Sequence, residues 1–271
     1  MRPLAELLAG RTVLTLDRAA LLVATLEHPG LDPEPWVQLL DSHAAELGGR
    51  IQAADGEAFI QAANDYLFTE LGFRGNAGNY YDPSNSCLNE VLVRRTGIPI
   101  TLAVIYLEIG RRLGFPLAGA GLPGHFLVRY DGGPEPVFLD PFHGGRQLDA
   151  EGCFALAASV TGIEVPRDPA LLAPVSTIHI AARMLNNLRG VYIARAAYRK
   201  ALPILDTLIE AFPAATDEYR HRGTLLMRLQ RMAEARRDFE RYLDLATSGE
   251  DERATVEKQL AEVNRWLARL N

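Results

Sequence analysis

The sequence predicts an α+β domain followed by an all-α domain of helical repeats. Apolar residues recur at helical spacing before about residue 75, and two strand-like segments flank a turn cluster after residue 124. From about residue 171 the pattern is helical to the end and repeats itself with a period of 34 residues. We therefore expect a first domain over 1–168 and a second over 169–271.

The composition is that of an ordinary globular protein, with 48% hydrophobic and 23% charged residues. A net charge of -6 argues against a nucleic-acid or anionic-membrane surface, because phosphate binding needs clustered Lys and Arg. No stretch of about 18 apolar residues is free of charge, and Asp17 and Arg18 interrupt the N-terminal apolar segment, so neither a membrane span nor a secretory signal is expected. Two cysteines without a CxxC pattern fit a reducing cytoplasm.

Three helices are expected in the first 75 residues, over Leu14–Leu26, Pro35–Leu47 and Glu57–Leu71. Apolar side chains recur every three or four residues in each of them, which is the spacing of one buried helix face. Three glycines between residues 72 and 78 then interrupt the pattern, and the turn-forming segment NYYDPSN follows. We expect these helices to pack against the middle of the chain.

A polar and aromatic cluster precedes Cys87, and it comprises Asn79, Tyr80, Tyr81, Asp82, Asn85 and Asn89. Such side chains often hold a loop in place by hydrogen bonding to its backbone, and they can also line a binding cleft. Both interpretations stay open from the sequence. A short helix is expected from Cys87 to Arg95, capped by Ser86 or Asn85, with Glu90 returning a hydrogen bond.

The next helix is expected to begin at Pro99, because proline suits the first helical position. Leu102, Tyr106, Ile109 and Leu113 share one face of it. The helix should stop at about residue 114, where a glycine follows two arginines that suit the last turn.

Beyond the helix, HFLVRY and PVFLDPF flank Asp131-Gly132-Gly133-Pro134, which predicts a β-hairpin. With Gly132-Gly133 as the tight turn, the numbers of opposed residues sum to 265, so that His125 lies opposite Asp140. Opposed residues have Cβ atoms about 4.5 to 5.5 Å apart on one face of the sheet. An imidazole and a carboxylate are therefore expected to meet, either as catalytic groups or as a hydrogen-bonded core pair.

A cysteine-dependent acyl-transfer site needs a thiolate, a base and a group that orients the base. Cys87, His125 and Asp140 offer these groups in that chain order, and a helix N-terminus would lower the pKa of the Cys87 thiol. The alternative for Cys87 is a small buried hydrophobe, and Cys153 is expected to be a core residue. The other histidines, at positions 28, 43, 143, 179 and 221, lack metal-ligand spacing, so we predict neither a metal nor a cofactor.

The helical repeat is defined by aligning Ala201 with Ala235, which gives the period of 34 that tetratricopeptide repeats have. Pro213 and Gly223 fall where such repeats carry proline and glycine. A final helix over Thr255–Leu270 is expected to cap the array, because each repeat hides its apolar face only against a neighbour. The alignment pairs Leu185 with Tyr219, Tyr192 with Leu226, Leu205 with Phe239, and Leu208 with Tyr242.

Five segments carry a resemblance that spans most of the chain: YLFTELGFRGN, NYYDPSNSCLNEVLVRRTGIPITLAVIYLEIGRRLGF, LPGHFLVR, FLDPF and ARMLNNLRGVY. Together they resemble the bacterial SirB-type family, which joins a transglutaminase-like domain to tetratricopeptide repeats. The resemblance implies a papain-like transglutaminase core, in which a helix packs against an antiparallel sheet, followed by the helical repeats.

Active transglutaminase-like enzymes carry cysteine at the start of the core helix, histidine on the next strand and aspartate on the strand after it. Their G-x-C-x-x-x-A…R-x-x-G pattern matches this chain at Gly97, Ala103, Arg111 and Gly114. The resemblance then places His125 on the histidine, Asp140 on the aspartate, and Pro99 on the cysteine. It implies a site with two of its three members, while Cys87 lies one helix earlier, where an aromatic residue is more usual.

We therefore expect a cytoplasmic pseudoenzyme that acts as a regulatory module and binds a protein or peptide through its repeat groove, with no nucleic-acid or membrane partner. The alternative is a cysteine-dependent peptidase or amidase that uses Cys87, His125 and Asp140. A purely structural scaffold is the third possibility. The residues expected to line the cleft are Asn79, Tyr80, Asp82, Asn85, Asn89, Pro99, Gly124 and Phe142.

Overall fold

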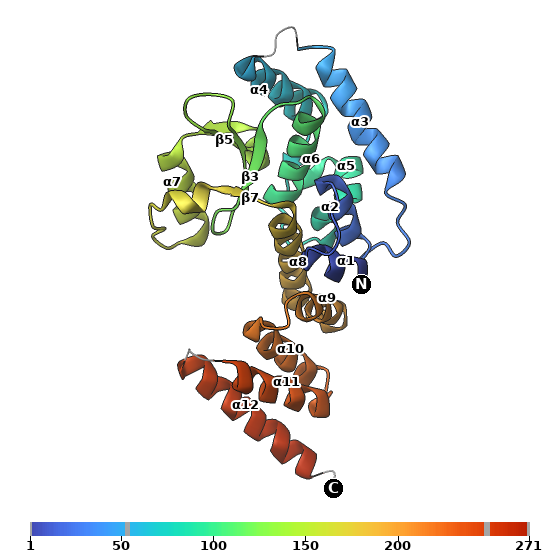
Figure 1. Ribbon diagram of the computed structural model, residues 1–271, viewed down its shortest axis with the longest axis vertical. Helices are drawn as coiled ribbons and strands as arrows, with labels where there is room; N and C mark the ends of the chain where they lie inside the picture. Colours follow the sequence, from blue (N-terminus) through green and yellow to red (C-terminus); the bar gives the residue numbers. More distant parts are fainter. Residues whose placement is uncertain (1, 52–54, 247–249, 270–271) are drawn as a thin grey trace. The chain divides into compact units, whose positions relative to one another are not determined.

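The computed structural model describes residues 2–51, 55–246 and 250–269 (Figure 1). The chain forms two compact units, which we call the core unit, Leu14–Met184, and the helical unit, Met1–Val13 with Leu185–Asn271. This division differs from the expected boundary after residue 168. Helix α8 (Thr177–Ala194) contributes to both units, and α1 (Arg2–Leu8), a helix that the sequence reasoning missed, packs against a helix of the second unit.

The predicted N-terminal helices of the core unit are present, and the third of them changes type along its length. A π-helical segment, Asp65–Glu70, continues α4, where a single α-helix to Leu71 was expected. Asp55 caps α4, because its carboxylate accepts hydrogen bonds from the backbone N–H groups of Glu57 and Ala58. The helices before residue 71 are α2 (Leu16–Ala24), α3 (Glu34–Gly48) and α4 (Gly56–Asn64).

Helix α6 (Pro99–Arg112) is the centre of the core unit, and it begins at the predicted proline. Every residue from Pro99 to Gly110 is buried, because α2 and α3 pack on one side and the strands β3 (Leu117–Ala120) and β4 (Leu127–Tyr130) on another. A helix buried all round is apolar all round, which explains why its sequence holds few polar residues. Gly114 follows it with a φ of 80°, as a helix-ending glycine does.

The short helix before α6 starts one residue later than predicted. Helix α5 spans Leu88–Arg94, and its N-cap is Cys87, whose side chain makes no capping hydrogen bond. The predicted caps, Asn85 and Ser86, belong instead to a 3₁₀ turn over Pro83–Ser86 that Asp82 caps. The 3₁₀ turn forms here because the Asp82 carboxylate accepts a hydrogen bond from the Ser84 backbone N–H at 3.1 Å.

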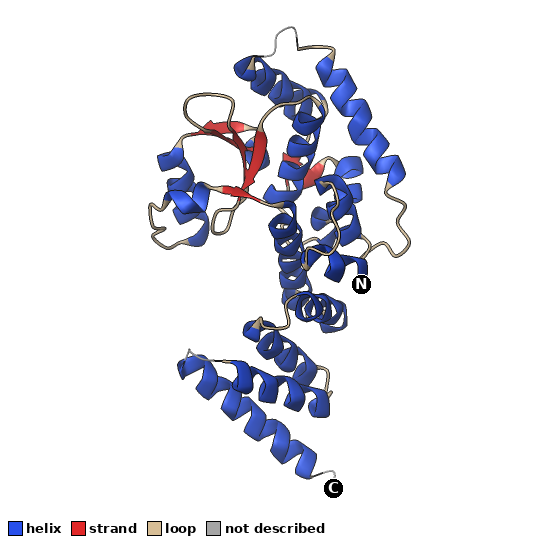
Figure 2. Ribbon diagram, viewed as in Figure 1, coloured by secondary structure: helices blue, strands red, loops and turns tan. Residues whose placement is uncertain are grey.

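The main sheet of the core unit has the antiparallel strand order β6-β5-β4-β3-β7, and α6 and α7 (Ala150–Thr161) cover its opposite faces (Figures 1 and 2). A second, two-stranded sheet pairs β1 with β2 in parallel. Cys153 of α7 is buried against Leu127 and Phe138 of the main sheet, as expected of a core cysteine. The strands are β1 (Arg74–Gly75), β2 (Thr96–Gly97), β3 (Leu117–Ala120), β4 (Leu127–Tyr130), β5 (Val137–Asp140), β6 (Arg146–Leu148) and β7 (Pro174–Val175).

The predicted hairpin between β4 and β5 forms, but its register was wrong by two positions. Tyr130 pairs with Val137, so the numbers of opposed residues sum to 267 rather than 265. The connection is the whole segment 131–136 and not a two-residue turn, and the backbone N–H of Asp131 donates to Pro116 beside β3. A shift of two leaves every side chain on its predicted face of the sheet.

The helical unit confirms the predicted repeat. All ten paired positions of the 34-residue alignment are buried, from Leu185 in α8 to Tyr242 in α11. The capping helix α12 spans Glu250–Ala268, and the predicted end at Leu270 lies outside the described residues. Among the described helices, none combines the length and apolar character needed to cross a bilayer. The remaining helices are α9 (Tyr198–Ala211), α10 (Thr216–Arg228) and α11 (Met232–Leu245).

Candidate functional site

The predicted histidine–aspartate pair is present. His125 Nε2 lies 2.9 Å from Asp140 Oδ1, and both residues are buried, with relative exposures of 4% and 0%. With the register observed, the two positions are diagonal rather than directly opposed, which is still within reach of long side chains. The contact was predicted correctly although the exact pairing was not.

A tight turn before β4 positions His125. The His125 N–H donates to the Leu122 carbonyl at 3.3 Å, and Gly124 between them has a φ of 68°. Proline in the second position and a glycine of positive φ in the third are the signature of a type II turn. Gly124, predicted as a cleft residue, is exposed, and its role in the structure is to permit this turn.

Arg183 of α8 fixes the same turn from the other side. Its Nη2 donates to the carbonyls of Leu122 and His125 at 2.6 and 2.5 Å, and its guanidinium lies 5.5 Å from the Phe126 ring centroid. Burial lowers the pKa of Arg183, because the surroundings disfavour its charge. A charged group held against two carbonyls in this way rigidifies the backbone that carries His125.

Asp140 binds a second imidazole that the sequence reasoning left unassigned. His143 Nδ1 lies 2.6 Å from Asp140 Oδ2, so one carboxylate accepts a hydrogen bond from each of two histidines. Burial opposes the negative charge, but the hydrogen bonds from His125 and His143 outweigh burial and lower the pKa of Asp140. The spacing D-x-x-H, closed into one 3₁₀ turn over Pro141–His143, is the signal that could have revealed this contact.

The two imidazole rings are nearly parallel, with centroids 5.9 Å apart and an interplanar angle of 16°. Phe142 meets both rings edge-on, at 6.0 Å from His125 and 5.1 Å from His143. It also packs on Gly75, where a Cβ atom would lie 2.6 Å from its ring, so only glycine admits it. Tyr80, 37% exposed, lies on its other side at 6.2 Å between ring centroids.

Neither candidate for the nucleophile presents a solvent-accessible thiol. Pro99, on the position that the resemblance gives to the cysteine, is buried in the first turn of α6 and carries no nucleophile. Cys87 is 0% exposed, and its thiol donates to the Pro83 carbonyl at 3.6 Å. That hydrogen bond directs the thiol hydrogen to a backbone oxygen, which is the behaviour of a structural cysteine.

The polar cluster before Cys87 is largely occupied with its own backbone. The Asn85 amide donates to the carbonyls of Asn79 and Tyr80 at 2.8 and 3.1 Å, and its side-chain oxygen accepts from Asn76 at 3.0 Å. Asp82 forms an ion pair with Arg94 at 2.8 Å. The structure thus favours the loop-holding interpretation for Asn85 and Asp82. Within the described chain the buried Asn89 Oδ1 finds no hydrogen-bond partner.

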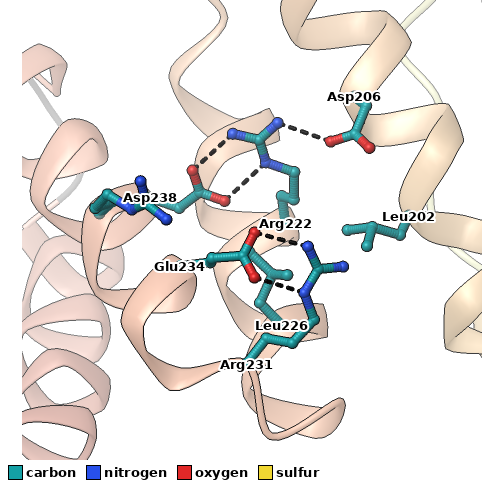
Figure 3. A pocket seen from close by; sticks show the side chains of 8 residues that line it. Leu202, Asp206, Arg222, Leu226, Arg231, Glu234 and Asp238 are labelled. Atoms are coloured by element: carbon teal, nitrogen blue, oxygen red, sulfur yellow. Dashed lines mark hydrogen bonds and ion pairs between the residues drawn. The ribbon is translucent and has the colours of Figure 1, made fainter. Parts of the chain in front are cut away.

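The helical unit has a polar pocket of its own, which we call the repeat pocket, between α9, α10 and α11 (Figure 3). Arg222 of α10 is its central side chain. It donates through Nε and Nη2 to both oxygens of Asp238 at 2.8 and 2.7 Å, and through Nη1 to Asp206 at 2.8 Å. Leu202, Leu226, Arg231, Glu234 and Arg237 complete the lining. A binding groove on the repeats is expected from the sequence, but these residues are not identifiable from it.

Comparison with known proteins agrees with this architecture. The transglutaminase-like superfamily model matches residues 34–186, and a tetratricopeptide repeat model matches residues 188–261. The chain is 41% identical over 239 residues to a UPF0162 protein of Xylella fastidiosa, covering 87% of this chain and 85% of that one. It is 36% identical to human F-box only protein 21 over 138 residues, which are 48% of this chain and 21% of that protein.

Among solved structures, a crystal structure of menin matches with a TM-score of 0.38 at 12% identity, covering 84% of this chain and 65% of that chain.

Proposed function

This chain belongs to the transglutaminase-like superfamily, and on that premise we propose that it is a non-catalytic member of it, a cytoplasmic regulatory module that binds a protein or peptide through its helical repeats. One observation carries the proposal. His125 and Asp140, which the resemblance places on the superfamily's histidine and aspartate, are in contact, whereas Pro99 holds the position that the resemblance gives to the nucleophile. The Cys87 thiol is buried and donates to the Pro83 carbonyl.

The loss of the thiol leaves a pair that has no acyl-transfer step to perform. A neutral histidine held by a carboxylate activates a nucleophile only when a thiol or hydroxyl lies at its other nitrogen. Proline at that position supplies neither group. The hydrogen bonds that remain serve to order the β4–β5 edge and the turn after it.

The repeat pocket supports the binding part of the proposal. Its lining combines three arginines with three acidic side chains on neighbouring helices, and Arg222 is already matched by Asp206 and Asp238. Arg237 is exposed and lines the same pocket. A peptide laid in a groove between repeats meets both signs of charge there, which confers selectivity more than raw affinity.

Site-specific photocrosslinking tests the binding function. A benzophenone amino acid placed at Arg237, which lines the pocket, is expected to crosslink a discrete partner in cells. The same substitution at Arg236 is the matched control, because Arg236 is its exposed neighbour on α11, forms an ion pair with Glu240 at 3.7 Å and is not among the residues that line the pocket. Identical crosslinks from both positions, or none from position 237, would refute a role for the repeat pocket.

A cysteine-dependent peptidase or amidase is the second candidate, and the contact between His125 Nε2 and Asp140 favours it, because it leaves the other ring nitrogen for a thiol. In that mechanism Cys87 would attack the carbonyl while His125 carries the proton. Cys87→Ala then abolishes hydrolysis. Under the non-catalytic proposal the same substitution leaves the crosslink from position 237 unchanged.

A further inference from the structure

We propose that His125, Asp140 and His143 form a binding site for one divalent transition-metal ion, with Zn²⁺ as its prototype. Among the described residues, one nitrogen from each imidazole and a carboxylate oxygen of Asp140 lie within 4.8 Å of one another. This assignment does not depend on the partner-binding function proposed above. It gives the pair a role that needs no thiol.

The chemistry of the three side chains matches a known kind of site. Two imidazoles and one carboxylate are the ligands of catalytic zinc sites that keep a fourth position for water, and of the two-histidine, one-carboxylate iron sites. Zn²⁺ bonds of about 2.0 to 2.1 Å put ligand atoms about 3.3 Å apart around a tetrahedral ion. His125 Nε2 lies 2.9 Å from Asp140 Oδ1, and His143 Nδ1 lies 2.6 Å from Asp140 Oδ2. Both imidazoles therefore already lie against the carboxylate, and small side-chain rotations would open the ligand atoms to the separation that an ion needs.

The three ligands differ in exposure in a way that suits an open metal site. Asp140 and His125 are buried, whereas the His143 side chain is 47% exposed. His143 therefore has the freedom to close on an ion held by the other two, and the solvent side supplies a water as fourth ligand. Phe142 packs edge-on to both imidazoles and limits how far their rings can turn.

Proton balance allows the exchange of hydrogen bonds for metal bonds. In the metal-free protein each imidazole donates its N–H to the carboxylate, which can only accept. When the ion binds, the ring hydrogen of His125 moves to Nδ1 and that of His143 moves to Nε2. Each imidazole thus changes its tautomer and offers a lone pair to the ion without releasing a proton.

One nearby charge opposes the cation. Arg146 Nη2 lies 3.7 Å from Asp140 Oδ2, and its side chain is 52% exposed. This arginine competes with the ion for the carboxylate and repels it, although water screens the repulsion. The opposition gives the proposal a sharp test, because removing Arg146 must strengthen binding rather than weaken it.

Isothermal titration of the full chain with Zn²⁺, supported by the visible absorption of bound Co²⁺, measures the site. We expect one ion per chain. His143→Ala should weaken binding at least about 10-fold, because even groups behind the ligands contribute factors of about 10 to 100. Arg146→Ala should tighten it a few-fold. His179→Ala is the matched control, since His179 is exposed, bonds to Ser176 and lies outside the cluster.

Far-UV circular dichroism establishes that the variants are folded, and the partly exposed His143 and Arg146 are chosen because their truncation leaves the core intact. His125→Ala provides the buried counterpart and should lose the Co²⁺ absorption. The proposal is overturned if Zn²⁺ does not bind at millimolar concentration. It is equally overturned if His143→Ala binds Zn²⁺ with the same affinity as the wild type and His179→Ala, because the ion would then be bound adventitiously elsewhere.

Discussion

The ion cluster at the end of α6 allows a quantitative prediction. Arg112 is 10% exposed and donates to Asp17 and Glu108, whose side chains are 2% and 1% exposed. The substitution Arg112→Met keeps most of the aliphatic volume but leaves two buried carboxylates without this cation. Breaking a buried ion pair by removing one partner costs about 3 to 5 kcal/mol.

The structure places the expected cost at the lower end, about 3 kcal/mol, because both carboxylates keep other donors. Thr15 still donates to Asp17 at 2.5 Å, and Arg111 still donates to Glu108 at 2.9 Å. Arg111→Met is the matched control. Arg111 bonds to the same Glu108, but its side chain is 52% exposed, so its loss should cost less than about 1 kcal/mol.

The assay is urea unfolding followed by tryptophan fluorescence in a Trp266→Phe background. The chain has two tryptophans, Trp36 in the core unit and Trp266 in the helical unit, so this background reports the core unit alone. The reasoning is refuted if Arg112→Met lowers the free energy of unfolding no more than Arg111→Met does.

Asp17 makes the difference in free energy of unfolding between the wild type and Arg112→Met depend on pH. Burial raises the pKa of Asp17, but hydrogen bonds from Thr15 and Arg112 outweigh burial, and the folded-state value lies below the ordinary 3.8. A lowered carboxyl pKa contributes stability above the unfolded-state pKa, and that stability is lost as the pH falls through the folded-state pKa. The difference in free energy of unfolding between wild type and Arg112→Met should therefore be full at pH 7 and shrink as the pH falls below the ordinary carboxyl value of 3.8. A difference of constant size would exclude Asp17 as its source.

Three further substitutions test the packing of the two units. In the helical unit, Gly223→Val should lower the free energy of unfolding by about 1 to 3 kcal/mol, because a Cβ atom there lies 2.6 Å from the Phe239 ring. Gly190→Ala has open space around it and should raise the free energy of unfolding by about 0.5 to 1 kcal/mol. Unfolding followed through Trp266 in a Trp36→Phe background measures both changes, and equal effects would contradict the packing described. In the core unit, Asn85→Ala removes three hydrogen bonds and should lower the free energy of unfolding, measured through Trp36, by about 1 to 3 kcal/mol. An unchanged free energy of unfolding would contradict the loop-holding interpretation of Asn85 and favour its interpretation as a cleft residue.

Much of the fold could be predicted from the sequence because local rules and burial agree there. Pro99 and Gly114 bound α6 as proline and glycine usually do, and the 34-residue spacing pairs ten positions that are all buried. The hairpin register could not be predicted, since the expected register followed from a two-residue turn at Gly132-Gly133, whereas the strands are joined by the longer segment 131–136.

The candidate site shows the same contrast. The contact between His125 and Asp140 was predictable because a register error of two keeps side chains on one face. His143 does not stand out by helical metal-ligand spacing, because its contact with Asp140 depends on the 3₁₀ turn Pro141–His143 that brings its imidazole back to the carboxylate. Where Cys87 points was also out of reach, because its thiol bonds to Pro83 within the turn that Asp82 caps.

The central claim is that no reactive thiol serves His125, and the rate of alkylation of the native protein tests it most directly. Iodoacetamide labelling at pH 7, with each site identified by mass spectrometry, should modify Cys87 and Cys153 only as fast as the protein opens, because both are 0% exposed. Burial also raises the pKa of Cys153 to about 12, so it supplies almost no thiolate. Rapid labelling of native Cys87 that slows in His125→Ala would contradict the account, because it would show that the histidine activates that thiol.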